Sequence, residues 1–214
     1  MSFEKFIVDA SKSTHLDYSY FSTAGEVSRY SSLMPWNLIH VRDAMLKEIP
    51  DAKQIIDLTA HIGVDSVHFG VLYPNAKIIS LESNLEFYLL LKDNLLKYST
   101  NSECLNADST QLLDDPVVTS SDVVYLDPEW GGHGYQKDTI KLCIGDTSVE
   151  EVIRKCLQNN VKVVILKGPC NLFTDDLYNL GLINEMKVDV HKYKIYTKPQ
   201  GGKLSYLLYF FRLI

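Results

Sequence analysis

The chain has 214 residues, of which 46% are hydrophobic and 22% charged, and its formal net charge is −6. This length suits one α/β domain, and the composition is that of an ordinary globular protein. The acidic balance excludes a protein that coats nucleic acid through charge, although a local patch could still grip a few nucleotides. No stretch reaches the roughly 20 apolar residues that a membrane helix needs.

The cysteines and the N-terminal residues favour an intracellular location, cytoplasmic or nuclear. The first residues lack the basic-then-apolar layout of a signal peptide. Reduced thiols are expected, and no metal site is predicted, because the cysteines are widely spaced and form no paired zinc or redox motif: Cys104, Cys143, Cys156 and Cys170.

Residues 1–34 are polar and aromatic without clear periodicity, and they predict an irregular arm or a short helical lid. A single domain is expected over 35–214. Its first part alternates helical and strand patterns, beginning with Pro35 at a helix start and stopping at Pro50. The predicted order is helix, strand, helix, strand, helix, over 35–49, 54–58, from about 65, 77–82 and about 84–98.

The second part continues the alternation. Ser148 and Glu151 form a capping box at the start of a helix that reaches about Leu157. Strands are predicted over 104–106, 122–126 and 161–166, and a further helix over 175–180, ended by Gly181. The tail differs, because 185–197 and 204–213 are both strand-like and are joined by a turn at 199–202.

Alternating strands and helices predict a parallel sheet with helices on both faces. The terminal hairpin adds antiparallel strands, which distinguishes class I methyltransferases from nicotinamide-binding Rossmann domains. We therefore expect an α/β, Rossmann-like class I methyltransferase fold, with a mostly parallel seven-stranded sheet and a C-terminal antiparallel hairpin. This is an argument about the fold and does not establish function.

Acidic residues follow successive strands of the predicted sheet. Asp57 closes the first strand, Glu82 closes the second about 25 residues later, and Asp108 follows the third. Ligands of open α/β sheets bind at the carboxyl ends of the strands. A carboxylate only accepts hydrogen bonds, so Glu82 could take both hydroxyls of a ribose, while Asp108 would lie near the adenine or serve only as a helix cap.

The loop after the first strand contains one glycine, Gly63, where dinucleotide-binding loops have three. This favours a nucleoside that carries a sulfonium over one that carries phosphates, and S-adenosylmethionine is the expected cofactor. His61 is interpreted as a packed or solvent-facing loop residue. The predicted cofactor-binding residues are Asp57, Thr59, Ala60, Gly63, Asp65, Glu82, Ser83, Asp108, Ser109 and Asp127.

The fourth predicted strand runs into the sequence Asp127-Pro128-Glu129-Trp130-Gly131-Gly132. This loop resembles the Asn/Asp-Pro-Pro-aromatic motif of methyltransferases that modify exocyclic amino groups of bases. The resemblance implies that Asp127 and a loop carbonyl accept hydrogen bonds from the target amine, and that Trp130 stacks on the base. The predicted catalytic residues are Asp127, Pro128, Glu129 and Trp130.

The full string is more specifically similar to the trimethylguanosine synthase family, which methylates guanine N2 of an RNA cap. Residues 30–35 resemble the segment ahead of that family's first helix, and 166–171 resemble its Pro-x-Asn after the fifth strand. The resemblance covers about residues 28–175 and implies capped RNA as partner. Glu129 replaces the family's second proline, and His61 and Val64 stand in its glycine-rich loop.

Glu129 and Trp130 suit a methylated cap, because N7-methylguanine is a cation whose N1–H and N2 amine are donors. A ring stacked on a cation contributes about 0.5–2 kcal/mol, and a carboxylate adds charge-assisted hydrogen bonds. The alternatives are a core anchor for Trp130 and a solvated carboxylate for Glu129. Lys167 and Asn171 are further predicted substrate-binding residues, with Lys167 as the candidate partner of the cap phosphates.

Three other functions stay open. One is methylation of another exocyclic amine, such as N6 of adenine. Another is ribose 2′-O-methylation, in which Lys167 would assist deprotonation of the hydroxyl, although the Pro-Glu-Trp loop disfavours it. The third is a catalytically silent scaffold that binds cofactor or RNA, which the departures at Glu129 and His61 permit. No dedicated strong base is needed, because the sulfonium is already activated and alignment supplies most of the rate.

Overall fold

The computed structural model describes residues 37–98, 101–131, 140–174, 177, 186–197 and 202–214. The predicted N-terminal arm lies outside the described residues. The predicted helix over 175–180 does so too, except for Leu177, as does most of the hairpin turn.

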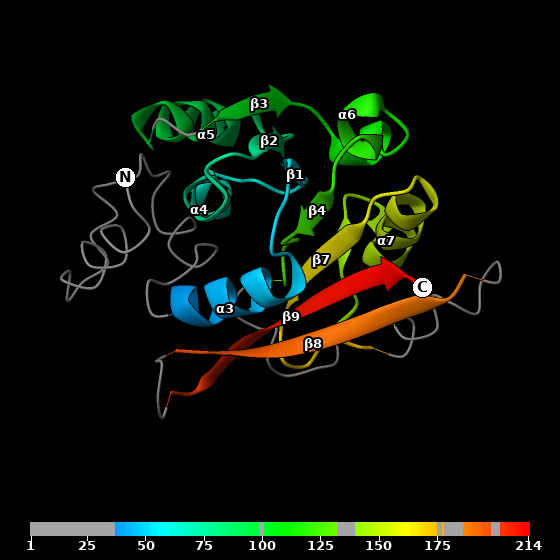
Figure 1. Cartoon of the computed structure of the whole chain (residues 1–214). Helices are drawn as coiled ribbons and strands as arrows, with labels where there is room; N and C mark the ends of the chain where they lie inside the picture. Colours follow the sequence, from blue (N-terminus) through cyan, green and yellow to red (C-terminus); the bar gives the residue numbers. More distant parts are fainter. Residues whose placement is uncertain (1–36, 99–100, 132–139, 175–176, 178–185, 198–201) are drawn as a thin grey trace.

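A seven-stranded sheet forms the centre of the molecule, with strand order β3-β2-β1-β4-β7-β9-β8 (Figure 1). Pairing is parallel from β3 through β7, and β9 joins antiparallel to both β7 and β8. This confirms the Rossmann-like prediction with its C-terminal hairpin. The strands are β1 Gln54–Asp57, β2 Lys77–Glu82, β3 Ser102–Asn106, β4 Val123–Leu126, β7 Val163–Gly168, β8 Val188–Tyr196 and β9 Leu204–Leu213.

The helices lie within a few residues of their predicted bounds. They are α3 Leu38–Glu48, α4 Val64–Leu72, α5 Leu85–Tyr98 and α7 Val149–Gln158. The Ser148 hydroxyl accepts from the main-chain N–H of Glu151, as a capping box requires, but the Glu151 carboxylate pairs with Arg154 instead of reaching back. Short elements that the patterns did not predict are the 3-10 turn η3 Ser109–Leu112, helix α6 Pro116–Thr119, and the strand pair β5 Cys143–Ile144 and β6 Thr147–Ser148.

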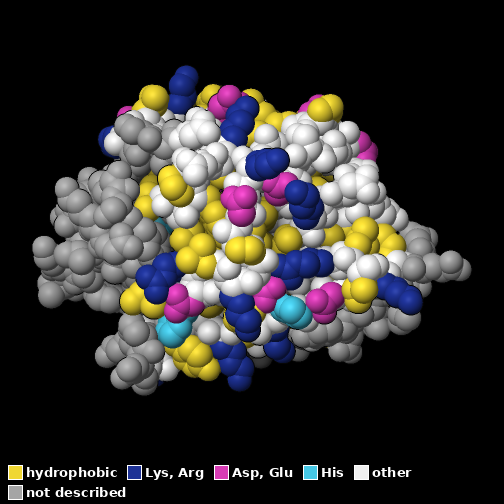
Figure 2. All heavy atoms as spheres, viewed as in Figure 1, with side chains coloured by type: hydrophobic (Ala, Val, Ile, Leu, Met, Phe, Trp, Pro, Cys, Tyr) yellow, Lys and Arg dark blue, Asp and Glu magenta, His cyan; other side chains and the backbone are white. Residues whose placement is uncertain are grey.

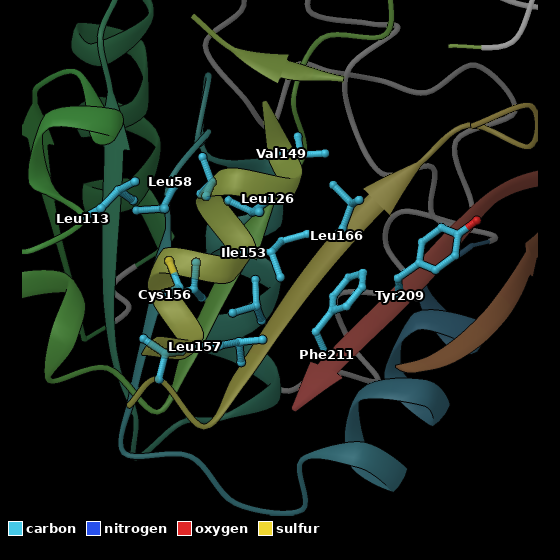
Figure 3. Packing of buried hydrophobic residues seen from close by; sticks show 14 of the residues in the cluster. Leu58, Leu113, Leu126, Val149, Ile153, Cys156, Leu157, Leu166, Tyr209 and Phe211 are labelled. Carbon is cyan, nitrogen blue, oxygen red and sulfur yellow. The ribbon is translucent and has the colours of Figure 1, made fainter. Parts of the chain in front are cut away.

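Two apolar cores cover the two faces of the sheet. On one face α7 packs over β4, β7 and β9, with Ile153, Cys156 and Leu157 directed at Leu126, Leu166 and Phe211 (Figure 3). On the other face α3 and α4 pack over the sheet through residues such as Met45 and Phe69. Among the described residues, no helix combines the length and the apolar character needed to cross a membrane.

The α4 face becomes polar toward the carboxyl ends of the strands. In a strand, side chains two residues apart lie on the same face, and Ile55, Ile78 and Ile165 contribute to the apolar core on this face. Two residues further along each strand come Asp57, Ser80 and Lys167. The N-terminal turn of α4 covers them with Asp65 and Ser66, all five being buried. The fold therefore places a buried polar cluster beneath the end of the sheet where ligands of such folds bind.

Candidate active site

Asp127 and Lys167 lie side by side at the carboxyl end of the sheet. Leu126 of β4 is paired in register with Leu166 of β7, so the residues that follow them are neighbours. Lys167 Nζ lies 2.5 Å from Asp127 Oδ2. The main-chain N–H of Asp127 also donates to the Thr59 hydroxyl, with N and O 2.6 Å apart. The end of β4 is thus fixed both to the neighbouring strand and to the loop after β1.

The environment of Asp127 works against its charge and partly compensates it. Burial raises the pKa of the Asp127 carboxyl, the Lys167 ammonium lowers it, and the Asp65 carboxylate raises it again, with a net result of about 6. The side chain remains 14% exposed. Asp127 is therefore placed to face a ligand while it is held from below by Lys167.

Lys167 is buried, with 5% of its side chain exposed. Its ammonium lies 3.5 Å from Asp65 Oδ2 and 5.2 Å from the centroid of the Tyr206 ring. Although burial lowers the pKa of Lys167, the carboxylates of Asp127 and Asp65 raise it above its ordinary value. A charged lysine turned inward onto two carboxylates does not fit contact with cap phosphates, and the geometry favours a role through Asp127 instead.

Asp65 is enclosed rather than turned toward a ligand. Its Oδ2 accepts a hydrogen bond of 2.7 Å from the Tyr125 hydroxyl, in addition to facing Lys167. Direct contact between Asp65 and a cofactor, as the sequence predicts, does not fit this arrangement.

Asp57 is also internal, with 1% of the residue exposed. Its carboxylate accepts from the Thr59 main-chain N–H at 3.1 Å and from the Ser66 hydroxyl at 2.7 Å, and Ser66 accepts in turn from Ser80. Burial and the nearby charge of Asp65 raise the pKa of Asp57 to about 8. The predicted contact with cofactor is thus replaced by a structural task, because Asp57 shapes the loop that carries Thr59.

Glu82 ends β2 and ties two loops together. Its carboxylate accepts from the main-chain N–H of His61 at 2.9 Å and from that of Asn84 at 2.7 Å. Burial raises the pKa of Glu82, and the negative charge of Glu129 contributes in the same direction. Each carboxylate oxygen accepts more than one hydrogen bond, so Glu82 can still receive two ribose hydroxyls. Ser83 follows it and is exposed.

The loop between β1 and α4 has a left-handed backbone at His61 (φ 50°) and Gly63 (φ 86°). A Cβ at Gly63 would lie 2.5 Å from a methyl carbon of Leu91. Gly63 is therefore required by its backbone conformation and by α5, and not by the approach of a ligand. The His61 ring packs against Phe87 with centroids 4.2 Å apart, and Ala60 is buried while its N–H bonds to Leu81.

Asp108 caps the turn η3, which is the alternative role that the sequence allows. Its carboxylate accepts from the main-chain N–H of Thr110 at 3.0 Å and from the Thr110 hydroxyl at 2.7 Å. Asp108 is exposed and the next residue, Ser109, is buried. The cap and a contact with adenine are compatible, and the second stays a prediction for both residues.

The rest of the catalytic loop follows Asp127 directly. Pro128 is buried, Glu129 is exposed, and Trp130 is half-buried. The Trp130 ring packs against both apolar cores, and its centroid lies 6.4 Å from that of Tyr206. Part of the core-anchor role is thus observed, and the exposed part of the ring leaves the stacking role open.

Asn171 lies in the loop after β7, half-buried, where its main-chain oxygen accepts from the N–H of Ile140. This loop is also joined to the segment that follows the catalytic loop by a bridge between Ile140 and Leu172. Contact of Asn171 with a substrate remains a prediction.

The residues present fit S-adenosylmethionine. Glu82 offers oxygen acceptors at the end of β2, Asp108 is exposed beyond β3, and Asp127 borders the same end of the sheet at β4. Within the described part of the chain, no group of three or more His, Cys, Asp or Glu residues could hold a metal ion.

Sequence reasoning missed the polar partners beneath the site. Tyr125 reads as one more apolar strand residue, and Ser66, Ser80 and Tyr206 belong to no motif. The only available signal is that Tyr125 and Asp127 alternate on one face of the same strand, which would have directed attention to the partners of that face.

Comparison with known proteins supports the site and the fold. The sequence profile described as RNA cap guanine-N2 methyltransferase matches residues 52–213. A relative from Acanthamoeba polyphaga mimivirus, "Uncharacterized protein L320", is 33% identical over 145 residues, which are 66% of this chain and 56% of the relative. The chain thus spans little more than half the length of that relative.

Solved structures with low sequence identity share the fold. Precorrin-6y C5,15-methyltransferase from Geobacter metallireducens has a TM-score of 0.57 at 20% identity, covering 93% of this chain and 96% of that one. The 16S rRNA N2 G1207 methyltransferase from T. thermophilus, in complex with AdoMet and guanosine, has a TM-score of 0.56 at 16% identity, covering 90% and 45%. Because the profile match covers most of the chain, including the loop at the end of β4, the chain belongs to the RNA cap guanine-N2 methyltransferase family and is an S-adenosylmethionine-dependent methyltransferase.

Proposed function

We propose that the protein transfers a methyl group to the exocyclic N2 amine of an N7-methylguanosine RNA cap. The observation that carries the proposal is the position of Asp127, half enclosed at the carboxyl end of β4 and followed by exposed Glu129 and half-buried Trp130. The family match supports guanine-N2 chemistry on RNA. The N7-methylated cap is argued from the two loop residues.

Asp127 is proposed to orient the amine. One of its oxygens is occupied by Lys167, and the other makes no hydrogen bond with any described residue. That oxygen can accept an N–H of the amine, which turns the nitrogen lone pair toward the methyl group. Alignment of this kind is worth orders of magnitude in rate without a strong base.

The reaction balances with the residues present. When bound, S-adenosylmethionine supplies an activated methyl on a positively charged sulfur. A nitrogen–carbon bond forms as the carbon–sulfur bond breaks, the electron pair stays on sulfur, and the amine becomes cationic. Asp127 or water then accepts its extra proton, and for Asp127 this requires the ionised carboxylate.

Glu129 and Trp130 are proposed to select the methylated base. Glu129 is exposed, and its charge acts on Glu82, so the mouth of the site is negatively charged. A negative mouth favours a cationic base over a neutral one, and stacking on Trp130 adds about 0.5–2 kcal/mol for a cation. The surface in Figure 2 carries Lys and Arg side chains interspersed with acidic ones, so broad electrostatic attraction of RNA is not the source of selectivity.

The ribose 2′-O alternative is weakened by the state of Lys167. A lysine that assists deprotonation of a hydroxyl must give up its own charge, whereas the carboxylates of Asp127 and Asp65 raise the pKa of Lys167. Methylation of another exocyclic amine and a silent scaffold are outcomes of the following test.

The test is incubation of the protein with labelled cofactor and short RNAs that carry an N7-methylguanosine cap, an unmethylated guanosine cap, or a 5′ triphosphate, with an adenine-rich uncapped RNA added. We expect label on N2 of the N7-methylated cap and little on the others. Trp130→Ala should abolish transfer while cofactor binding by calorimetry is kept. Equal turnover of caps with and without the N7 methyl contradicts the cap assignment.

A further inference from the structure

We propose that Lys167 is a positioning residue, which, with Asp65 and Tyr125 behind it, holds the Asp127 carboxylate ionised and in one orientation. The inference deepens the proposed function, on which its role in transfer rests, because Asp127 is the group argued to orient the amine. It differs from the sequence-based expectation, in which Lys167 contacts substrate itself.

The geometry is set by the sheet and not by a flexible side chain. Strands β4 and β7 are paired in register through Leu126 and Leu166, so Asp127 and Lys167 leave the sheet next to each other on the α4 face. Lys167 Nζ then meets Asp127 Oδ2 at 2.5 Å. Because the contact uses this one oxygen, it fixes the plane of the carboxylate and leaves the other oxygen for a ligand.

A second layer holds the lysine. Asp65 Oδ2 lies 3.5 Å from Lys167 Nζ and accepts the Tyr125 hydroxyl at 2.7 Å. The Tyr206 ring lies on the ammonium at 5.2 Å. These contacts come from α4, β4 and β9, so the ammonium is bounded by three elements that are far apart in the sequence.

Every titratable group that acts on Asp127 can be named by its element. Asp65 comes from α4, Asp57 from β1, Tyr125 from β4, Lys167 from β7 and Tyr206 from β9. Of these only Lys167 is a cation, while Asp65 and Asp57 are acids. Without Lys167, the buried Asp127 carboxylate would have acidic neighbours alone, and it would bind a proton more readily.

The arrangement predicts opposite effects for the two neighbours of Asp127. In Lys167→Met the cation is lost, so the Asp127 carboxyl should hold its proton to higher pH. In Asp65→Asn a like charge is lost while the shape is kept, so Asp127 should release its proton at lower pH. Lys162→Met is the matched control, because Lys162 is exposed and paired with Asp122 at the opposite end of the sheet.

The experiment is a pH titration of carboxyl ¹³C signals in protein labelled at aspartate, with Asp127 assigned through Asp127→Asn. It needs no RNA, so its result does not depend on the proposed function, which the RNA panel tests separately. We expect the midpoint to rise in Lys167→Met, to fall in Asp65→Asn and to stay unchanged in Lys162→Met. An unchanged midpoint in Asp65→Asn overturns the proposal even where Lys167→Met fails to fold.

Transfer by the same variants gives a second measurement. If the carboxylate form of Asp127 is required, each unit by which its pKa rises reduces activity about tenfold at acidic pH. Lys167→Met should therefore lose kcat at low pH and regain part of it at high pH, with KM for RNA little changed. A raised KM for RNA with an unmoved pH profile would indicate phosphate binding and overturn the proposal.

Discussion

Arg212 near the end of β9 donates two hydrogen bonds to Glu48 at the end of α3, one to the carboxylate and one to the main-chain oxygen, each at 2.6 Å. The Glu48 side chain is 6% exposed and also meets Tyr193 and His191 of β8. Although burial raises the pKa of Glu48, these hydrogen bonds lower it to about 2. This contact pins α3 to the hairpin, and at the other end of α3 Asn37 reaches Ser205.

Arg212→Gln is expected to lower the free energy of unfolding by about 3 kcal/mol, because it leaves a largely buried carboxylate without its cation. Urea denaturation measures the change. Arg154→Gln is the control, since its pair with Glu151 lies within one exposed helix turn and should be worth less than about 1 kcal/mol. Equal effects of the two variants would show that Glu48 does not anchor α3.

The same contact predicts an acid-dependent loss of stability. The Glu48 pKa in the folded protein lies below its ordinary value of 4.5, so the charged form stabilises the fold above that pH. The contribution is lost as pH falls from about 4.5 to about 2. Glu48→Gln should flatten the stability curve in this window, as measured by denaturation at several pH values, and a curve as steep as that of the wild type contradicts the prediction.

Asp57→Asn should have the opposite dependence on pH. The folded pKa of Asp57, about 8, lies above its ordinary value of 3.8, so folding favours the protonated form. Its contribution is present at low pH and declines as pH rises toward 8, by at most about 1.4 kcal/mol per pH unit. Asparagine keeps an acceptor for Thr59 and cannot ionise. Thermal unfolding between pH 5 and 8 should therefore depend less on pH in the variant, and an unchanged slope would show that another group titrates.

Glu82→Ala is expected to weaken binding of S-adenosylhomocysteine by about 1.5–3 kcal/mol, the range for a lost charged acceptor. The variant also frees the main-chain N–H groups of His61 and Asn84, so the loss should include an effect on the loop. Calorimetry measures the affinity. Glu86→Ala, an exposed neighbour in α5, is the control, and absence of cofactor binding by the wild type would contradict the assignment of this site.

Asp127→Asn and Asp127→Ala separate orientation from proton transfer. Asparagine keeps an oxygen of the same reach, while alanine loses it, and a misplaced nucleophile costs on the order of a hundredfold. If orientation dominates, single-turnover rates should be partly retained in the asparagine variant and nearly lost in the alanine variant. Equal loss in both indicates that the proton acceptor is essential, and wild-type rates in both would place the active site elsewhere.

The order of the strands and their carboxyl ends could be predicted from the sequence. Strand β2 at 77–82 and strand β9 at 204–213 have the predicted bounds, because their apolar side chains are contiguous along the chain and local periodicity reports them. The same holds for Glu82 and Asp127, each placed at the end of a strand by its position after an apolar run. The residues of the catalytic loop were therefore found before any tertiary contact was known.

What those side chains touch was decided by the tertiary structure alone. Asp57, Glu82 and Asp127 are equivalent in the sequence, yet one is enclosed, one bridges two loops, and one meets a lysine that lies 40 residues away. The difference arises because β1 lies at the centre of the sheet under α4, while β7 pairs with β4 in a register that sets Lys167 beside Asp127. Local pattern fixes where a strand ends, but burial and charge pairing are set by the neighbours that the strand order brings to that end.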